Sequence, residues 1–93
     1  MGYAAVNITD TATLILTANS RRQSHLLMNN DTVNTVYIGG DSSVTDTEAY
    51  PLGPLNQLIE DKSKAGYQAS AIYGICEAGK TAEVRYWERI RSV

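Results

Sequence analysis

Apolar and polar side chains alternate with a period of two in several short segments of this chain. The alternation is clearest in residues 11–17, 34–38 and 81–87. Successive side chains of a β-strand point to opposite faces, so each segment is expected to form a strand with one buried face. The residues predicted to point inward are Ala12, Leu14, Leu16, Val36, Ile38, Ala82, Val84 and Tyr86.

Further strands are expected between these segments. Residues 23–29 are apolar in the middle, as in a strand buried on both faces, and residues 67–73 form a strand of small side chains. Residues 43–45 suggest a short extended piece, and residues 55–60 suit a strand or one helical turn, of which we favour the strand. Seven or eight short strands separated by turn residues are the pattern of an all-β sandwich or barrel.

The length of the chain and its cysteine and histidine content limit the number of domains and the ways in which the fold can be stabilised. Its 93 residues fit one domain, which buries roughly 60–70% of the surface of the unfolded chain. Cys76 is the only cysteine and His25 the only histidine, so neither an internal disulfide nor a zinc cluster is possible. Oligomerisation is therefore the expected source of additional stability.

The charge and hydropathy of the chain exclude several classes of partner. A net charge of −2 gives no basic footprint for nucleic acid. No apolar run approaches the ~18 residues of a membrane span, so no membrane partner is expected. The first ten residues lack the pattern of a signal peptide, and we expect a protein made in a reducing cytoplasm.

One motif points to a nucleotide. The stretch Gly74–Thr81, GICEAGKT, matches the phosphate-binding P-loop pattern G-x-x-x-x-G-K-[ST]. A P-loop needs a helix after it, whereas residues 81–87 alternate as a strand. We therefore interpret the motif as a β-hairpin with its loop at residues 77–80 and a positive φ at Gly79, and expect no nucleotide.

Other candidate chemistry is weak. His25 has no neighbouring nucleophile, and Cys76 follows an apolar strand and is expected to be a small buried hydrophobe. The acidic stretch 41–48 does not match a calcium loop, and Glu60 and Asp61 are adjacent, so on a strand they point to opposite faces. We expect no catalytic residue, no cofactor and no metal.

Three aromatic residues fall on the polar side of the alternation or in loops, namely Tyr37, Tyr50 and Trp87. Rigid aromatic side chains outside a core are typical of interfaces and sugar-binding surfaces. The alternative is that the second face of a sandwich buries some of them. Without a catalytic constellation, this feature favours binding or assembly.

An ordered set of short motifs carries a family resemblance. These are Ala18, Asn19 and Arg22; Leu26, Leu27, Asn29 and Asn30; Val36–Gly40; Ser43–Thr45; Tyr50–Leu52; Ile72, Tyr73 and Ile75; and Ala78, Gly79 and Thr81–Arg85. Together they resemble the small β-rich virion proteins of tailed bacteriophages, over residues 13–88. This chain has Lys80 where many members run directly from Gly to Thr, which a turn tolerates.

The resemblance implies a compact, jelly-roll-like antiparallel β-sandwich without catalytic residues. It implies a structural virion protein, made in the bacterial cytoplasm and located on the outer capsid surface. We expect a capsid decoration protein that binds the major capsid protein and forms a homo-oligomer, with a trimer favoured. The alternative is a head-fibre or tail-fibre module that binds a host receptor or carbohydrate, with Trp87, Tyr37 and Tyr50 as stacking platforms; a nucleotide enzyme is the third hypothesis.

The expected domain organisation is an N-terminal arm at residues 1–10 and one β-sandwich domain at residues 11–93. The arm is apolar near Tyr3 and Val6 and is a candidate strand for addition to a neighbouring sheet. At the other end, Arg89 and Arg91 are candidates to meet an acidic capsid surface. With the three aromatic residues, these are the predicted partner-binding residues.

Overall fold

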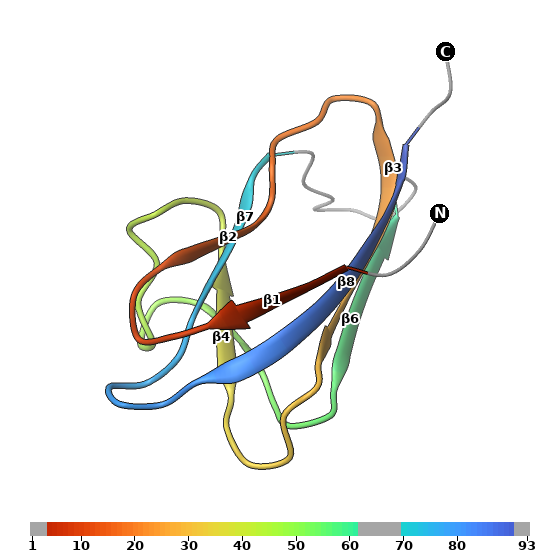
Figure 1. Cartoon of the computed structure of the whole chain (residues 1–93). Coiled ribbons are helices and arrows are strands. Elements are labelled where there is room, and N and C mark those ends of the chain that lie inside the picture. The colour runs from red at the N-terminus through yellow and green to blue at the C-terminus, as the bar shows by residue number, and fades with distance from the viewer. Residues whose placement is uncertain (1–3, 62–69, 91–93) are drawn as a thin grey trace.

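The computed structural model describes residues 4–61 and 70–90, and it contains eight β-strands. The strands are β1 (Ala4–Ile8), β2 (Thr13–Leu16), β3 (Arg22–Asn29), β4 (Val36–Gly39), β5 (Tyr50–Leu52), β6 (Gln57–Asp61), β7 (Ile72–Ile75) and β8 (Ala82–Ile90). They form two four-stranded antiparallel sheets, which we call sheet A (β1-β8-β3-β6) and sheet B (β2-β7-β4-β5). Figure 1 shows β3, β6 and β8 facing β2, β4 and β7 across the sandwich.

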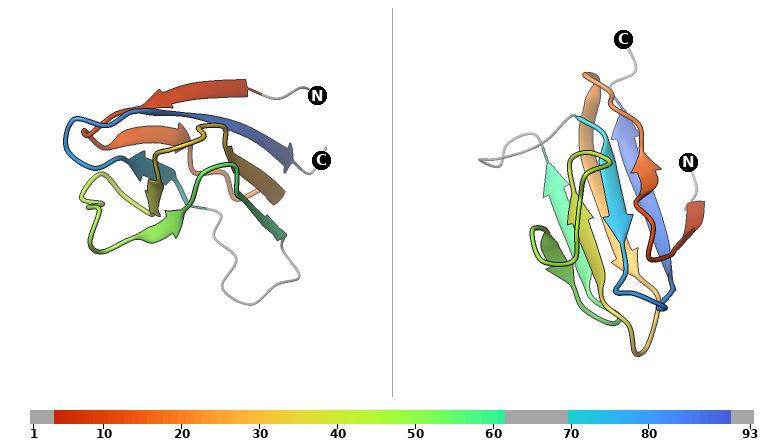
Figure 2. Two further views of the ribbon diagram at one scale, coloured as in Figure 1. Left: turned by 90° about the horizontal axis from the view of Figure 1, so that it is seen from below. Right: turned by 90° about the vertical axis from the view of Figure 1, so that its left-hand side faces the viewer.

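The pairing of the strands has a simple order. The first strand pairs with the last, the second with the seventh, the third with the sixth and the fourth with the fifth. A long antiparallel hairpin that is rolled into two facing sheets has this order, which is that of an eight-stranded jelly roll. The expected all-β antiparallel sandwich is confirmed, and Figure 2 shows its two layers from two further sides.

The core lies between the sheets and is built from both. Its buried members are Ile8, Ile15, Leu16, Leu27, Val36, Ile38, Leu52, Ile72, Cys76, Ala82 and Val84. The inward positions predicted in residues 34–38 and 81–87 are confirmed, because Val36, Ile38, Ala82 and Val84 are buried and Tyr86 packs against the core. Cys76 is 2% exposed, as predicted, and burial raises the pKa of its thiol.

The prediction for β2 is wrong in one respect. Leu14 pairs with Tyr73 but Leu16 pairs with Ile72, so the strand contains a bulge at Ile15. A bulge adds one residue and shifts the phase of the side chains. As a result Ile15 and Leu16 are both buried, whereas Leu14 is 40% exposed.

Two further details differ from the predictions. Residues 43–45 belong to no strand: Ser43 lies in a turn, in which the Val44 amide donates to the Asp41 carbonyl oxygen at 3.2 Å, and residues 44–45 are irregular. Residues 23–29 are not buried on both faces, because Leu26 and Met28 on the outer side of β3 are only half-buried. Within residues 4–61 and 70–90 no further layer of strands covers this side of sheet A.

The P-loop-like stretch forms a turn, but not a hairpin. Lys80 donates its amide to the Glu77 carbonyl oxygen at 2.9 Å, and Gly79 has the predicted positive φ, at 77°. However, β7 belongs to sheet B and β8 to sheet A, so the turn connects the two sheets and its flanking strands do not pair. The prediction of a hairpin was wrong because local sequence marks a turn without showing which sheet each strand joins.

The N-terminal residues join the sandwich. Residues 4–8 of the expected arm form β1, which pairs with β8 of the same chain from Ala4 opposite Tyr86 to Ile8 opposite Ala82. Ile8 is completely buried and Val6 packs against the core. The structure therefore uses these residues as an edge strand of sheet A.

Candidate functional site

The predicted partner-binding residues lie on different surfaces of the sandwich. Trp87 and Arg89 point outward from sheet A, while Tyr37 points outward from sheet B. Tyr50 pairs with the inward-facing Ile38 and lies at an open side of the sandwich. Val6 points inward, and Tyr3 and Arg91 lie outside the described residues. The three aromatic residues thus do not form one shared platform.

An apolar row crosses the outer face of sheet A. Leu26 on β3 is directly opposite Trp87 on β8 and directly opposite Ile59 on β6. Residues opposite each other in neighbouring strands share a face, so the three side chains lie side by side. Ile59 is 53% exposed, and Leu26 and Trp87 are half-buried. We call Trp87, Leu26 and Ile59 the apolar row.

Polar and basic residues flank the apolar row. Two residues further along β3, Met28 is directly opposite Arg85 on β8 and Gln57 on β6. These three residues and Leu26 line a shallow depression of about 290 Å³. Arg85 Nε lies 3.2 Å from Glu83 Oε1 in an exposed ion pair, so its charge is partly compensated. On the opposite flank Arg89 is exposed. The face therefore combines an apolar centre with cations on both sides.

The outer face of sheet B carries a second group of apolar side chains. Tyr37 on β4 lies between Pro51 on β5 and Ile75 on β7. Desolvation raises the pKa of the Tyr37 hydroxyl, and the carboxylates of Glu77 and Asp46 act in the same direction. The hydroxyl therefore stays protonated at physiological pH and can donate a hydrogen bond.

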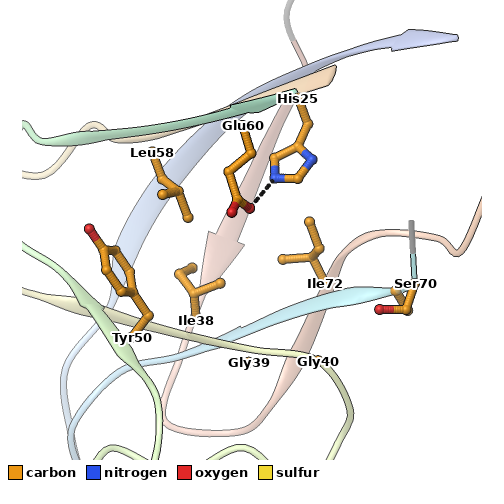
Figure 3. Close-up of a pocket in the computed structure, with 10 residues that line it drawn as sticks. His25, Ile38, Gly39, Gly40, Tyr50, Leu58, Glu60, Ser70 and Ile72 are labelled. Carbon is orange, nitrogen blue, oxygen red and sulfur yellow. Dashed lines mark hydrogen bonds and ion pairs between the residues drawn. The ribbon is translucent and has the colours of Figure 1, made fainter. Parts of the chain in front are cut away.

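A pocket of about 270 Å³ opens between the two sheets, where β5 and β6 form their edges. Its lining residues come from both sheets and from the connections next to β4 and β7: His25, Ile38, Gly39, Gly40, Tyr50, Leu58, Glu60, Ser70, Ala71 and Ile72. Figure 3 shows the carboxylate of Glu60 pointing into the pocket between Leu58 and the His25 ring, with Ile38 and Ile72 across from it.

His25 and Glu60 form a polar pair in the wall of this pocket. His25 Nε2 lies 3.0 Å from Glu60 Oε1, and the His25 side chain is fully buried while that of Glu60 is 29% exposed. Burial lowers the pKa of His25 below 6.5, although Glu60 acts in the opposite direction. At neutral pH the ring is therefore uncharged and donates its Nε2–H to the carboxylate, which can only accept.

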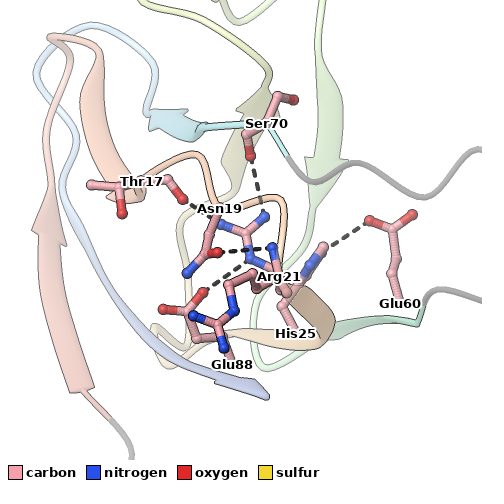
Figure 4. Close-up of polar contacts among 8 residues, drawn as sticks. Thr17, Asn19, Arg21, His25, Glu60, Ser70 and Glu88 are labelled. Atoms are coloured by element: carbon pink, nitrogen blue, oxygen red, sulfur yellow. Dashed lines mark hydrogen bonds and ion pairs between the residues drawn. The ribbon is translucent and has the colours of Figure 1, made fainter. Parts of the chain in front are cut away.

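A second polar group lies next to this pair, around the buried Arg22. Its Nε donates to Glu88 Oε2 at 3.0 Å, and its other nitrogens donate to the carbonyl oxygens of Thr17 and Ser70. Figure 4 shows these partners converging from separate segments. These hydrogen bonds link the two sheets, because Arg22 belongs to sheet A, whereas Thr17 and Ser70 flank strands of sheet B.

Sequence reasoning did not identify Arg22, Glu60 and Glu88 as members of a site. A usable signal existed for His25, because it is in phase with the buried Leu27 on β3. A polar residue in phase with buried apolar positions is expected to have a polar partner nearby. The identity of that partner depends on strand order, which brings Glu60 from 35 residues away.

The structure also limits the chemistry open to the described residues. Thr81 is followed by β8 rather than by a helix, so the helix N-terminus that holds phosphates in a P-loop is not formed there. No group of three or more His, Cys, Asp or Glu residues is placed to hold a metal ion within 4–61 and 70–90. In the same residues there is no helix long and apolar enough to cross a membrane. Comparison of the chain with protein-family models, curated proteins and solved structures found no match.

Proposed function

We propose that this chain is a structural bacteriophage virion protein, a capsid decoration protein that oligomerises and binds the major capsid protein on the outer head surface. The observation that carries the proposal is the apolar row on the outer face of sheet A, with Trp87, Leu26 and Ile59 in register. Aromatic and aliphatic side chains at the centre of a face, with arginines around them, are the usual composition of protein interfaces.

The fold supports the proposal by analogy. Eight-stranded jelly rolls occur in viral capsid domains and in lectins, although a fold alone does not define a function. The sequence resemblance to small virion proteins of tailed bacteriophages points in the same direction. An apolar face flanked by Arg85 and Arg89 suits a partner surface that is apolar with acidic margins.

One edge strand suits contact with another chain. Three of the four edge strands carry features that hinder strand addition: β5 contains Pro51, β2 contains a bulge, and β6 contains the inward-pointing charge of Glu60. β1 carries no charge, no proline and no bulge over Ala4–Ile8. It is therefore the edge of the sandwich best suited to extend a sheet into a neighbouring subunit.

Binding to empty capsids tests the proposal. We expect the wild-type protein to form a closed oligomer by light scattering and to saturate capsids at many copies per particle. Trp87→Ser and Ile59→Ser should weaken capsid binding by at least about tenfold, because residues at the centre of an interface carry most of its free energy. Leu14→Ser, on the outer face of sheet B, is the matched control and should leave binding unchanged.

Two results would contradict the proposal. One is that the wild-type protein does not bind capsids at any concentration at which it stays soluble. The other is equal loss of binding in Leu14→Ser and Trp87→Ser, which would indicate a general effect on folding rather than an interface on sheet A.

A second candidate function is a fibre module that binds a host receptor or a carbohydrate. The observation that favours it is the pocket with the half-exposed Tyr50 in its lining, because ligand sites are typically lined by apolar and aromatic side chains with a few polar groups. The copy number per particle separates the two functions, since a decoration protein is present in hundreds of copies and a fibre tip in a few.

A further inference from the structure

We propose that the pocket between β5 and β6 binds a single basic side chain of a partner protein, the ammonium of a lysine or the guanidinium of an arginine, against the Glu60 carboxylate. This inference deepens the proposed function and rests on it for the source of the side chain. The size, the walls and the charge of the pocket support a cation site independently of that function.

The size of the pocket suits a side chain. Its volume of about 270 Å³ lies close to the lower limit of the about 300–1,000 Å³ that is usual for ligand sites, so it has room for one long side chain. The pocket lies at the open side of the sandwich, where the edge strands of both sheets meet, so a projecting group from another surface can enter it.

The walls of the pocket suit an apolar stem. Ile38 and Ile72 from sheet B face Leu58 from sheet A across it. Lysine and arginine bury their methylene stems against such walls while the charged group reaches a polar partner. Tyr50 lies in the lining and is 54% exposed, so its ring is available to the stem or, through a cation–π contact, to the charge.

The charge of the pocket selects a cation. Glu60 is the only carboxylate among the described lining residues, and within the described chain its one polar partner is His25. The neighbouring Arg22 donates to Glu88 and to the carbonyl oxygens of Thr17 and Ser70. The carboxylate therefore keeps a net negative charge and accepting capacity toward the pocket.

A sugar fits this pocket less well. A monosaccharide brings several hydroxyl groups, and each one removed from water needs a partner. Apart from the Glu60–His25 pair, the described lining is dominated by apolar side chains such as Ile38 and Leu58. One carboxylate can pair with one cationic group, but it cannot accept hydrogen bonds from all the hydroxyl groups of a sugar.

The experiment uses the single histidine as a reporter. Since His25 is the only histidine of the chain, its ring signals in an NMR spectrum are unambiguous, and its ring lines the pocket. Butylammonium, a lysine side-chain analogue, is titrated into the full-length protein, with butan-1-ol as the neutral probe of the same length. We expect saturable shifts of the His25 signals with butylammonium at millimolar concentration and none with butan-1-ol.

Variants assign the charge to Glu60. Glu60→Gln keeps an acceptor for His25 but removes the charge, and we expect binding of butylammonium to weaken by about tenfold, because hydrogen bonds to charged groups are the stronger ones. Glu48→Gln removes an exposed carboxylate outside the pocket lining and serves as the control with unchanged binding. Equal shifts with both probes, no saturable shift in the wild type, or unchanged binding in Glu60→Gln would each overturn the cation site.

Capsid binding then distinguishes a protein side chain from a free amine. If a partner side chain occupies the pocket, Glu60→Gln weakens capsid binding and butylammonium competes with capsids. If Glu60→Gln loses butylammonium but keeps wild-type capsid affinity, the partner assignment is wrong. Wild-type protein that binds butylammonium but no capsids would instead contradict the proposed function and leave the cation site standing.

Discussion

The guanidinium of Arg22 is completely buried, and its Nε lies 3.0 Å from Glu88 Oε2, whose side chain is 25% exposed. This ion pair joins β3 to β8 within sheet A. The remaining nitrogens of Arg22 donate to the carbonyl oxygens of Thr17 and Ser70, which flank strands of sheet B. The Arg22 side chain thus links the two sheets at one end of the sandwich.

Replacing Arg22 with methionine should destabilise the protein by about 3 kcal/mol, since removal of one partner from a buried ion pair is strongly destabilising. The value is at the lower limit for such pairs because Glu88 is partly exposed and water can solvate it. Arg21→Met, at the exposed neighbouring position, should change the free energy of unfolding by less than about 0.5 kcal/mol. Equal effects of the two variants in urea unfolding would contradict this account.

The stability of the protein should depend on pH through His25. Burial lowers the pKa of His25 in the folded state below 6.5, so the folded protein favours the neutral ring. As the pH falls below 6.5, unfolded chains take up a proton that the folded protein takes up only at lower pH, and the free energy of unfolding decreases.

Urea unfolding from neutral to mildly acidic pH measures this dependence. His25→Gln is the matched variant, because its amide can donate to Glu60 but does not titrate. We expect the decrease below pH 6.5 in the wild type and its absence in His25→Gln. An identical pH dependence in both proteins would show that another group is responsible.

The bulge in β2 predicts opposite responses of two leucines. Leu16 is 4% exposed and Leu14 is 40% exposed. Leu16→Ala should therefore cost about 3 kcal/mol through the cavity that it creates, whereas Leu14→Ala should cost less than about 1 kcal/mol. Thermal unfolding of the two variants provides the comparison, and similar losses in both would mean that β2 lacks the bulge.

The two glycines of the P-loop-like motif should have structural roles. A Cβ on Gly74 would lie 3.0 Å from Ile15 Cδ1 in the core, so Gly74→Ala should destabilise by about 1–3 kcal/mol through overpacking. A Cβ on Gly79 would meet no atom within 4 Å, but φ is 77° there, so Gly79→Ala should cost about 1 kcal/mol through strain.

Gly40 is the control for both substitutions. A Cβ on Gly40 would also meet no atom within 4 Å, and its φ is not positive. Gly40→Ala should therefore leave the free energy of unfolding nearly unchanged or slightly raised. Chemical denaturation of the three variants measures whether the loss of stability is larger for Gly74→Ala and Gly79→Ala than for Gly40→Ala. A destabilisation of Gly40→Ala equal to that of Gly74→Ala would contradict the packing argument.

ATP should not bind to the P-loop-like stretch. Lys80 is exposed in a turn between two sheets, and no helix follows Thr81 in the described residues to supply amide groups to a phosphate. We therefore expect no change in the melting temperature on addition of Mg-ATP, and none on Lys80→Ala. ATP-dependent stabilisation that disappears in Lys80→Ala would reverse this interpretation.

The local sequence was sufficient to predict the class of fold. Alternation in residues 34–38 and 81–87 correctly placed Val36, Ile38, Ala82 and Val84 in the core, because strand periodicity is a property of neighbouring residues. It also identified Gly79 as a residue with a positive φ, although it did not identify Leu55, whose φ is 60°. These features depend on backbone geometry over a few residues, which the sequence specifies directly.

The errors arise where pairing between distant strands decides the outcome. The bulge at Ile15 is fixed by the register of β2 against β7, and the turn at 77–80 connects two sheets because of the jelly-roll order. Alternation gives the face of a residue relative to its neighbours, but it does not reveal an extra residue or the partner strand.

The same distinction applies to the candidate site. The sequence determined that Trp87 points away from the core, and that the only histidine lies in a strand. Only the tertiary structure aligned Trp87 with Leu26 and Ile59, and only strand order placed Glu60 beside His25 at the wall of a pocket. Periodicity is encoded locally, whereas a site is made by side chains that the rolled hairpin brings together from distant parts of the chain.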